Sequence, residues 1–164
     1  MDLSVHIVGQ DSSSEAIAAR LKGLGINVDQ LHGDYSVLYN TYQNVFESFH
    51  KITTADVVLI GSQVTPDNVL EVLYAVLKNK PIVTNGTASC ADGVDNFSKE
   101  IINKSLAHFY AKDITKIDEA QLRHFLTETA SQAVNYQLQS YQAALIRARV
   151  RAFFRVAVSP TVMA

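Results

Sequence analysis

The 164-residue sequence has almost no cysteine and no long apolar run. The single cysteine, Cys90, cannot form an internal disulfide, which favours a reducing compartment, and we expect a cytoplasmic location. No run approaches the roughly 18 apolar residues of a membrane span, so no membrane partner is expected. The first residues carry an acid where a signal peptide has a base, and His6 and Gly9 interrupt their apolar run. This segment is therefore expected to be a strand.

Composition is that of an ordinary globular domain, with 48% hydrophobic and 18% charged residues. A chain of this length buries a sufficient core without metals or disulfides. The net charge of −2 is unevenly distributed. Residues 140–164 contain four arginines and no acid, which leaves ten basic and sixteen acidic side chains in the other 139 residues. The C-terminal segment is thus basic on an acidic body.

Residues 55–86 contain the clearest structural signal, read as a strand at 55–61, a helix at 66–78 and a strand at 81–84. The two apolar runs, A-D-V-V-L-I-G and P-I-V-T, are too short for helices. They are also too continuous for strands with one face in water. Both therefore belong in the middle of a parallel sheet that is covered on both sides.

The rest of the chain continues the alternation of strands and helices. Strands are expected at 3–9, 26–31 and 108–111, and helices at 13–22, 35–51 and 97–106. Right-handed crossovers between such strands predict an α/β fold, a doubly wound, flavodoxin-like parallel sheet of four to five strands in the order 2-1-3-4-5.

The last part of the sequence predicts a long C-terminal helix, from Asp118 to about Arg155. Such a helix would measure roughly 55 Å, more than the width of a domain of this size. We therefore expect an α/β domain at 1–127 and a C-terminal helical extension at 128–164 that packs on a partner subunit in a homo-oligomer. A break near Ala152 is the alternative, because F-F-R-V-A-V could equally be a strand.

In this fold the loops after the first and third strands lie side by side, and both lead into helix N-termini. Free backbone N–H groups and the helix dipole favour a phosphate or carboxylate there. The candidate ligand-binding residues are Gly9, Gln10, Asp11, Ser12, Ser13, Gly61, Ser62 and Asn68, with Tyr35 at the border of the pocket.

The same loop residues also have purely structural interpretations. Ser12 and Glu15 have the spacing of a capping box, and Thr65 with Pro66 fits an N-cap followed by an N1 proline. The five aromatic residues at helical spacing are better explained as a packing face than as a stacking surface for a base. That stripe consists of Tyr35, Tyr39, Tyr42, Phe46 and Phe49.

Other candidate sites are weaker. The five histidines are scattered and none lies near Cys90 in sequence, so no metal site and no Cys–His nucleophile is expected. Arg147, Arg151 and Arg155 share a helix face with Arg149 beside them. Nucleic-acid phosphates could bind there, but an oligomer contact or a solvated face is the preferred interpretation.

The segment I-T-T-A-D-V-V-L-I, followed by a helix with E-V-L-Y-A and then K-P-I-V, resembles the nucleoside 2-deoxyribosyltransferase-like family, including its nucleotide N-glycosidase relatives. The resemblance covers residues 1–127. It implies that Glu71 attacks the anomeric carbon of a sugar, releases the base and leaves a glycosyl-enzyme intermediate for water or a second base. It implies a small-molecule nucleoside or nucleotide as the ligand and a structural role for Asp56. No cofactor is expected.

The family's pattern is altered around Glu71. Asp67 and Val69 stand where the family has glycines. Gly61, Ser62 and Gln63 stand where the family has an aspartate that handles the base. Asp67 or Asp11 is therefore the candidate acid in place of that aspartate. Two hypotheses result: N-glycosidic bond cleavage or transfer through Glu71, or a catalytically inactive relative acting as a nucleotide-binding or oligomeric interaction protein. Glu71 shares a helix face with Asp67 and Lys78 that could simply be solvated. An inward Glu71 within reach of Ser12 or Tyr35 favours the first hypothesis, and an exposed Glu71 with no cleft beside Gly9 favours the second.

Overall fold

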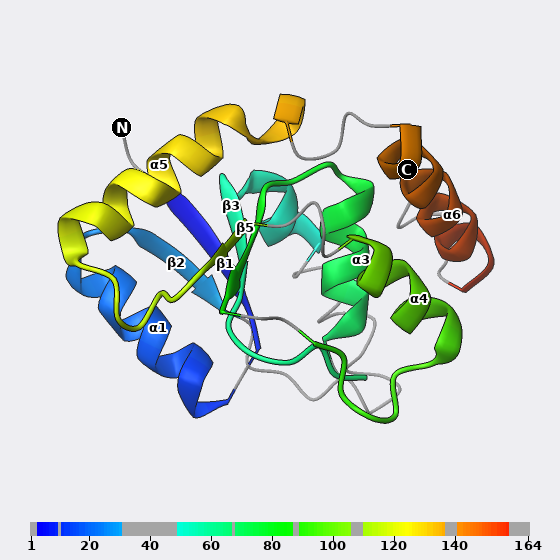
Figure 1. Cartoon of the computed structure of the whole chain (residues 1–164), viewed down its shortest axis with the longest axis horizontal. Coiled ribbons are helices and arrows are strands. Elements are labelled where there is room, and N and C mark those ends of the chain that lie inside the picture. Colours follow the sequence, from blue (N-terminus) through cyan, green and yellow to red (C-terminus); the bar gives the residue numbers. More distant parts are fainter. Residues whose placement is uncertain are drawn as a thin grey trace.

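The computed structural model describes residues 3–9, 11–30, 49–66, 68–86, 89–105, 110–136 and 141–157. Its centre is a five-stranded, all-parallel sheet in the order β2-β1-β3-β4-β5 (Figure 1). The strands are β1 (Ser4–Val8), β2 (Asn27–Gln30), β3 (Val57–Ile60), β4 (Ile82–Asn85) and β5 (Tyr110–Lys112). The fold class and the strand order predicted from sequence are confirmed.

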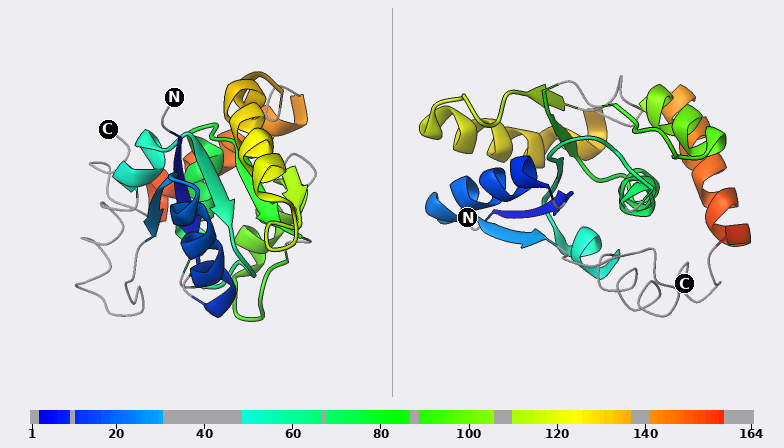
Figure 2. Two further views of the ribbon diagram at one scale, coloured as in Figure 1. Left: turned by 90° about the vertical axis from the view of Figure 1, so that its left-hand side faces the viewer. Right: turned by 90° about the horizontal axis from the view of Figure 1, so that it is seen from below.

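Helices connect the strands and cover both faces of the sheet (Figure 2). They are α1 (Ser12–Gly23), α3 (Val69–Leu77), α4 (Asn96–Ser105), α5 (Glu119–Tyr136) and α6 (Tyr141–Ala157), and residues 49–54 are also helical. Parallel neighbouring strands need long crossover connections, usually helices, and the observed alternation of strands and helices supplies them in a doubly wound arrangement.

Two helix starts differ from the expected ones. Asp11, not Ser12, is the N-cap of α1, and its carboxylate accepts a hydrogen bond of 2.9 Å from the backbone N–H of Ser14. The Ser12–Glu15 capping box is therefore wrong, because aspartate caps as well as serine and stands one residue earlier. Helix α3 begins at Val69 with Asn68 as N-cap, three residues after the expected start at 66.

The core consists of two apolar layers, one on each face of the sheet. Alternation along β1 divides its side chains between them: Val5 and Ile7 point toward α1 and α5, whereas Val8 points toward α3, α4 and α6. Strand β3 divides in the same way, and all four of its residues are buried. This explains why the central strands have continuous apolar sequences.

In place of one helix from 118 to 155, the structure describes two helices, α5 and α6, and residues 137–140 between them lie outside the described part. Leu122 and Leu126 of α5 pack in the layer with α1, whereas Ile146 and Val150 of α6 pack in the opposite layer with α3 and α4. No glycine or proline lies between them in sequence, so tertiary packing and not a local breaker separates the helices. The expected break near Ala152 is wrong, since α6 is helical through Ala157.

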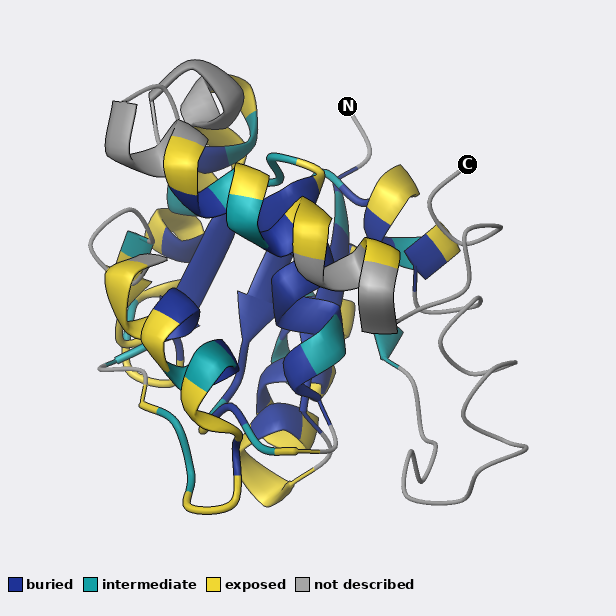
Figure 3. Cartoon of the chain, turned by 90° about the vertical axis from the view of Figure 1, so that its right-hand side faces the viewer, coloured by how far each residue is buried: buried dark blue, intermediate teal, exposed yellow. Residues whose placement is uncertain are grey.

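These helices change the argument for a partner subunit. Since α6 packs on its own chain, the length of the C-terminal helical region no longer requires a partner, and the homo-oligomer stays a prediction. Figure 3 shows buried residues on the sheet side of the helices and exposed residues on their outer sides. Among the helices that the structure describes, none is long and apolar enough to cross a membrane.

Of the aromatic stripe, only Phe49 lies within the described residues. It is buried and stacks on Tyr74 of α3, with ring centroids 3.9 Å apart and planes inclined by 6°. At this position the stripe therefore has the packing role that was preferred from sequence.

Candidate functional site

Glu71 lies in the first turn of α3 and is only 5% exposed. The other described side chains of this helix are all apolar, and all but one of its residues are buried. A carboxylate in such a helix is expensive to bury unless it is paired. The interpretation of Glu71 as part of a solvated face is therefore wrong, and the side chain points inward.

The partner of Glu71 is His6, in the middle of β1. The imidazole Nε2 lies 2.9 Å from Oε1 of Glu71, and His6 is completely buried. Alternation along β1 directs His6 to the same face as Val8, the face that α3 covers. An ionised carboxylate only accepts hydrogen bonds, so with Glu71 ionised Nε2 must carry the proton. The Nδ1 atom has no hydrogen-bond partner among the described residues.

The two loops predicted to form the pocket walls are in direct contact. The N–H of Gly61 donates to the carbonyl oxygen of Val8, the last residue of β1, at 3.1 Å, and Ser14 of α1 lies beside both Gly9 and Gly61. A Cβ atom at Gly9 would lie 2.4 Å from Oγ of Ser14, and one at Gly61 would lie 2.3 Å from it. Gly9 also has a φ of 123°, which favours glycine. Both glycines are thus required for this close approach.

Asp11 links the two loops electrostatically. Partial burial raises the pKa of its carboxyl group, but hydrogen bonds from the Ser62 hydroxyl and the Ser14 N–H outweigh this effect and hold the pKa below its ordinary value. Asp11 is therefore ionised at neutral pH. Its negative charge lies at the N-terminus of α1, where a phosphate would otherwise be favoured.

The remaining predicted site residues have different positions. Ser12 and Ser13 are exposed on the first turn of α1. Asn68 is buried and stabilises its own loop, accepting from the N–H of Thr65 at 2.8 Å and donating to the carbonyl oxygen of Gln63 at 3.3 Å. Three further candidates, Gln10, Tyr35 and Asp67, lie outside the described residues, and their roles stay predictions.

Sequence reasoning missed three polar residues around this edge of the sheet. They are His6, Gln30 and Asn85. Gln30 donates from Nε2 to the carbonyl oxygen of Gly9 at 2.7 Å. Asn85 donates from Nδ2 to the carbonyl oxygen of Gly61 at 3.4 Å. Gln30 and Asn85 are the last residues of β2 and β4. A usable signal was present for His6, because a polar residue inside a continuous apolar strand needs a buried partner.

Within the described ranges, no cluster of three or more histidine, cysteine, aspartate or glutamate side chains could hold a metal ion. The arrangement instead combines one buried carboxylate, paired with an imidazole, and two closely packed loops at the ends of β1 and β3. Comparison of the sequence with protein-family models and with curated proteins gave no match.

Proposed function

We propose that this protein cleaves or transfers the N-glycosidic bond of a nucleoside or nucleotide, with Glu71 as the nucleophile. The observation that carries the proposal is the inward Glu71 side chain, held at Oε1 by His6 at 2.9 Å. A carboxylate fixed in one orientation and shielded from water is suited to attack a carbon that develops positive charge.

The reaction would follow the double-displacement pattern of retaining glycosidases. A carboxylate oxygen of Glu71 forms a bond to the anomeric carbon while the bond between that carbon and the base nitrogen breaks. The base leaves with the electron pair and accepts a proton. Water or a second base then attacks the same carbon, and Glu71 is released as a carboxylate.

The leaving base needs a proton donor, and the two candidates differ. Because its pKa lies below the ordinary value, Asp11 is ionised at neutral pH and is a poor proton donor. The pKa of Asp11 therefore gives no support to Asp11 as the acid, and Asp67 stays the other candidate. His6 would act as a positioning residue, because its hydrogen bond fixes the carboxylate of Glu71.

The test is turnover of a panel of nucleosides and nucleotides, followed by liquid chromatography of the released base. Glu71→Gln keeps the size of the side chain but removes the nucleophile, and we expect a loss of at least about 10³-fold. The matched control is Glu15→Gln, an exposed glutamate in the first turn of α1, which we expect to keep full activity. Turnover by wild type that persists unchanged in Glu71→Gln would refute the role of Glu71.

A second candidate function is nucleotide binding without catalysis. It is supported by the low exposure of Glu71 and by Asp67 and Val69, which stand where the resembling family has glycines. Calorimetric titration with the same panel separates the two functions, since binding without turnover supports the second. The homo-oligomer and the cytoplasmic location stay predictions.

A further inference from the structure

On the side of the molecule away from α5, helices α4 and α6 form a groove of about 480 Å³. Its lining residues are Lys104, Leu145, Ile146, Ala148, Arg149 and Ala152. Leu145 is 48% exposed and is the only large hydrophobic residue with an exposed side chain among the described residues. An exposed leucine in a surface groove whose lining is mostly apolar is a candidate contact for another molecule.

The spacing of residues along α6 separates a face that packs on the chain's own core from a face that is exposed to solvent. Ile146 and Val150 are buried against the chain's own core. Leu145, Ala148 and Ala152 follow one another at steps of three and four, so they share the outer face of the helix, and all three are exposed. Two alanines beside one leucine leave space for a second helix to approach closely, because interaxial distance depends on the side chains at the contact.

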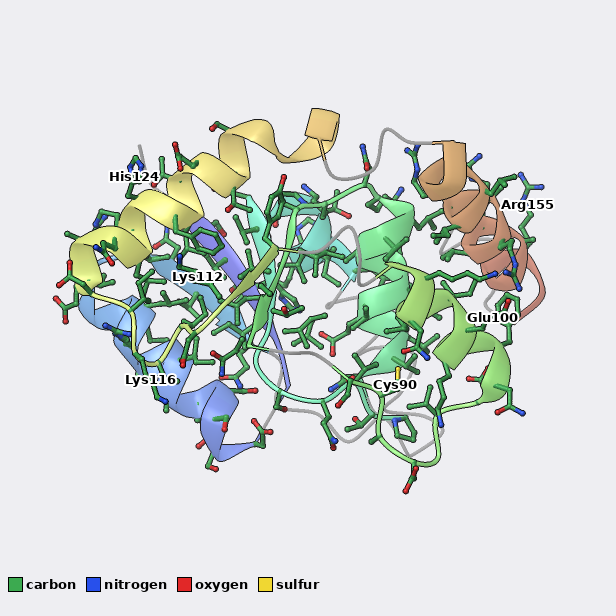
Figure 4. All side chains as sticks on the ribbon, in the orientation of Figure 1. Cys90, Glu100, Lys112, Lys116, His124 and Arg155 are labelled. Carbon is green, nitrogen blue, oxygen red and sulfur yellow. The ribbon has the colours of Figure 1, made fainter. Side chains whose placement is uncertain are left out.

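Charge around this outer face is strongly positive. Helix α6 contains four arginines and no acid. Glu100 of α4 pairs with Lys104 at 2.9 Å and with Arg149 at 3.3 Å. Arg151 and Arg155 are exposed, and among the described residues neither forms an ion pair. Figure 4 shows Arg155 and Glu100 on this side of the molecule.

The exposed apolar residues and the arginines of α6 together exclude three kinds of binding partner. A second copy docked symmetrically through the same face would bring the arginines of both α6 helices into one interface with no acid on either helix, and like charges brought close together are unfavourable. One leucine and two alanines are too little apolar surface to insert into a membrane. Nucleic-acid phosphates would pair with the arginines but would leave Leu145, Ala148 and Ala152 without a complementary apolar contact.

We propose that the outer face of α6 is a docking site for an acidic amphipathic helix of a partner protein. The apolar face of that helix would cover Leu145, Ala148 and Ala152, as in other helix-in-groove complexes. Its flanking glutamate and aspartate side chains would pair with Arg151 and Arg155. This proposal is independent of the chemistry at Glu71.

The probe is a synthetic helical peptide of about five turns, with leucines at every third or fourth position, glutamates on both sides and one central tryptophan. Because the protein contains no tryptophan, fluorescence excited selectively in the peptide reports only on the probe. We expect a saturable blue shift of the emission, as the indole enters an apolar environment, and weaker binding at high salt. A matched peptide with lysine in place of every glutamate should not bind.

Single substitutions in the protein locate the site at which the peptide binds. Arg155→Glu and Leu145→Gln should each weaken binding about tenfold, because one reverses a pairing charge and the other removes the apolar contact. Lys116→Glu is the control, since it changes the net charge as much as Arg155→Glu does but lies at the opposite end of the molecule (Figure 4). Circular dichroism checks that each variant is folded.

Equal binding of the acidic and basic peptides to wild type would overturn the proposal without any variant. So would an Arg155→Glu protein that binds the acidic peptide as tightly as Lys116→Glu does. Tighter binding to single-stranded DNA or to anionic phosphatidylserine vesicles, lost in Arg155→Glu but kept in Leu145→Gln, would assign the face to phosphates. Concentration-dependent self-association that is lost in Leu145→Gln would assign it to a second copy.

Discussion

His6 and Glu71 are ionisable residues in elements whose other side chains are largely apolar. Burying such a pair removes both groups from water, and an apolar pair of similar volume is often equally stable or more stable. Breaking a buried pair is different, because it leaves a charge or a polar group without its partner. The pair is therefore better explained by a requirement for a fixed carboxylate than by a requirement for stability.

A double-mutant cycle tests this argument. His6→Leu should lower the free energy of unfolding by about 3–5 kcal/mol, because Glu71 stays buried without its imidazole partner. The double variant His6→Leu, Glu71→Met should recover much of that loss, since both groups become apolar. Urea unfolding of wild type, both single variants and the double variant gives the coupling energy. Additive effects would mean that the two side chains do not interact.

Close packing at the loops gives a second prediction for single residues. A Cβ at Gly61 would lie 2.3 Å from Oγ of Ser14 and 3.0 Å from its Cα, so the backbone itself would have to move. Gly61→Ala should therefore destabilise the protein by about 1–3 kcal/mol.

Gly23→Ala is the matched control for Gly61→Ala, because nothing lies within 4 Å of its Cβ position. There the loss of unfolded-state entropy should leave stability unchanged or raise it by up to about 1 kcal/mol. Thermal unfolding of the two variants compares the sites directly. Equal effects at both glycines would show that the β1 and β3 loops are not closely packed.

At the scale of elements, the cap of α1 can be tested, because Asp11 and Ser12 are both possible N-cap residues. Asp11→Ala should cost about 1 kcal/mol, whereas Ser12→Ala should cost almost nothing, because only Asp11 accepts the N–H of Ser14. The pKa of Asp11 lies below its ordinary value of 3.8. Its contribution to stability is thus complete well above pH 3.8 and is lost as the pH falls through the lower folded-state pKa.

Urea unfolding of wild type and Asp11→Ala between pH 7 and pH 2 checks this dependence. The difference in free energy between the two proteins should shrink toward the acidic end of the range. A larger effect of Ser12→Ala than of Asp11→Ala would restore the capping box that the sequence suggested.

The sequence predicted elements well where a pattern depends on burial alone. Strand β3 is apolar at every residue and was placed within two residues of its observed ends. Helix starts were less predictable, because Asp11 and Ser12 are both good caps, as are Thr65 and Asn68. The propensities of these residues do not separate the two candidates at either helix.

The candidate site was predictable only in part. Glu71 was identified through a resemblance in sequence, but its partner His6 is 65 residues away and no local pattern joins them. The division between α5 and α6 was equally hidden, since no glycine or proline marks it. Long-range packing decided both features.

At the scale of the whole molecule, the position of α6 gives a prediction about the domain boundary. Ile146→Ala should lower the free energy of unfolding by about 2–5 kcal/mol, because Ile146 is buried against the α3 and α4 layer. The neighbouring Leu145→Ala should have little effect, since that side chain is half exposed. Urea denaturation compares the two, and equal, small effects would mean that α6 is not part of the core.

Helices α5 and α6 follow one another in the chain but cover opposite faces of the sheet, and this order matters during synthesis. Helix α3 is buried on nearly every side, partly by α6. Until residues 141–157 have left the ribosome, the outer side of α3 stays open to solvent. The nascent chain must then carry an apolar helix without this cover, so we expect its risk of aggregation to stay high until α6 has packed against α3.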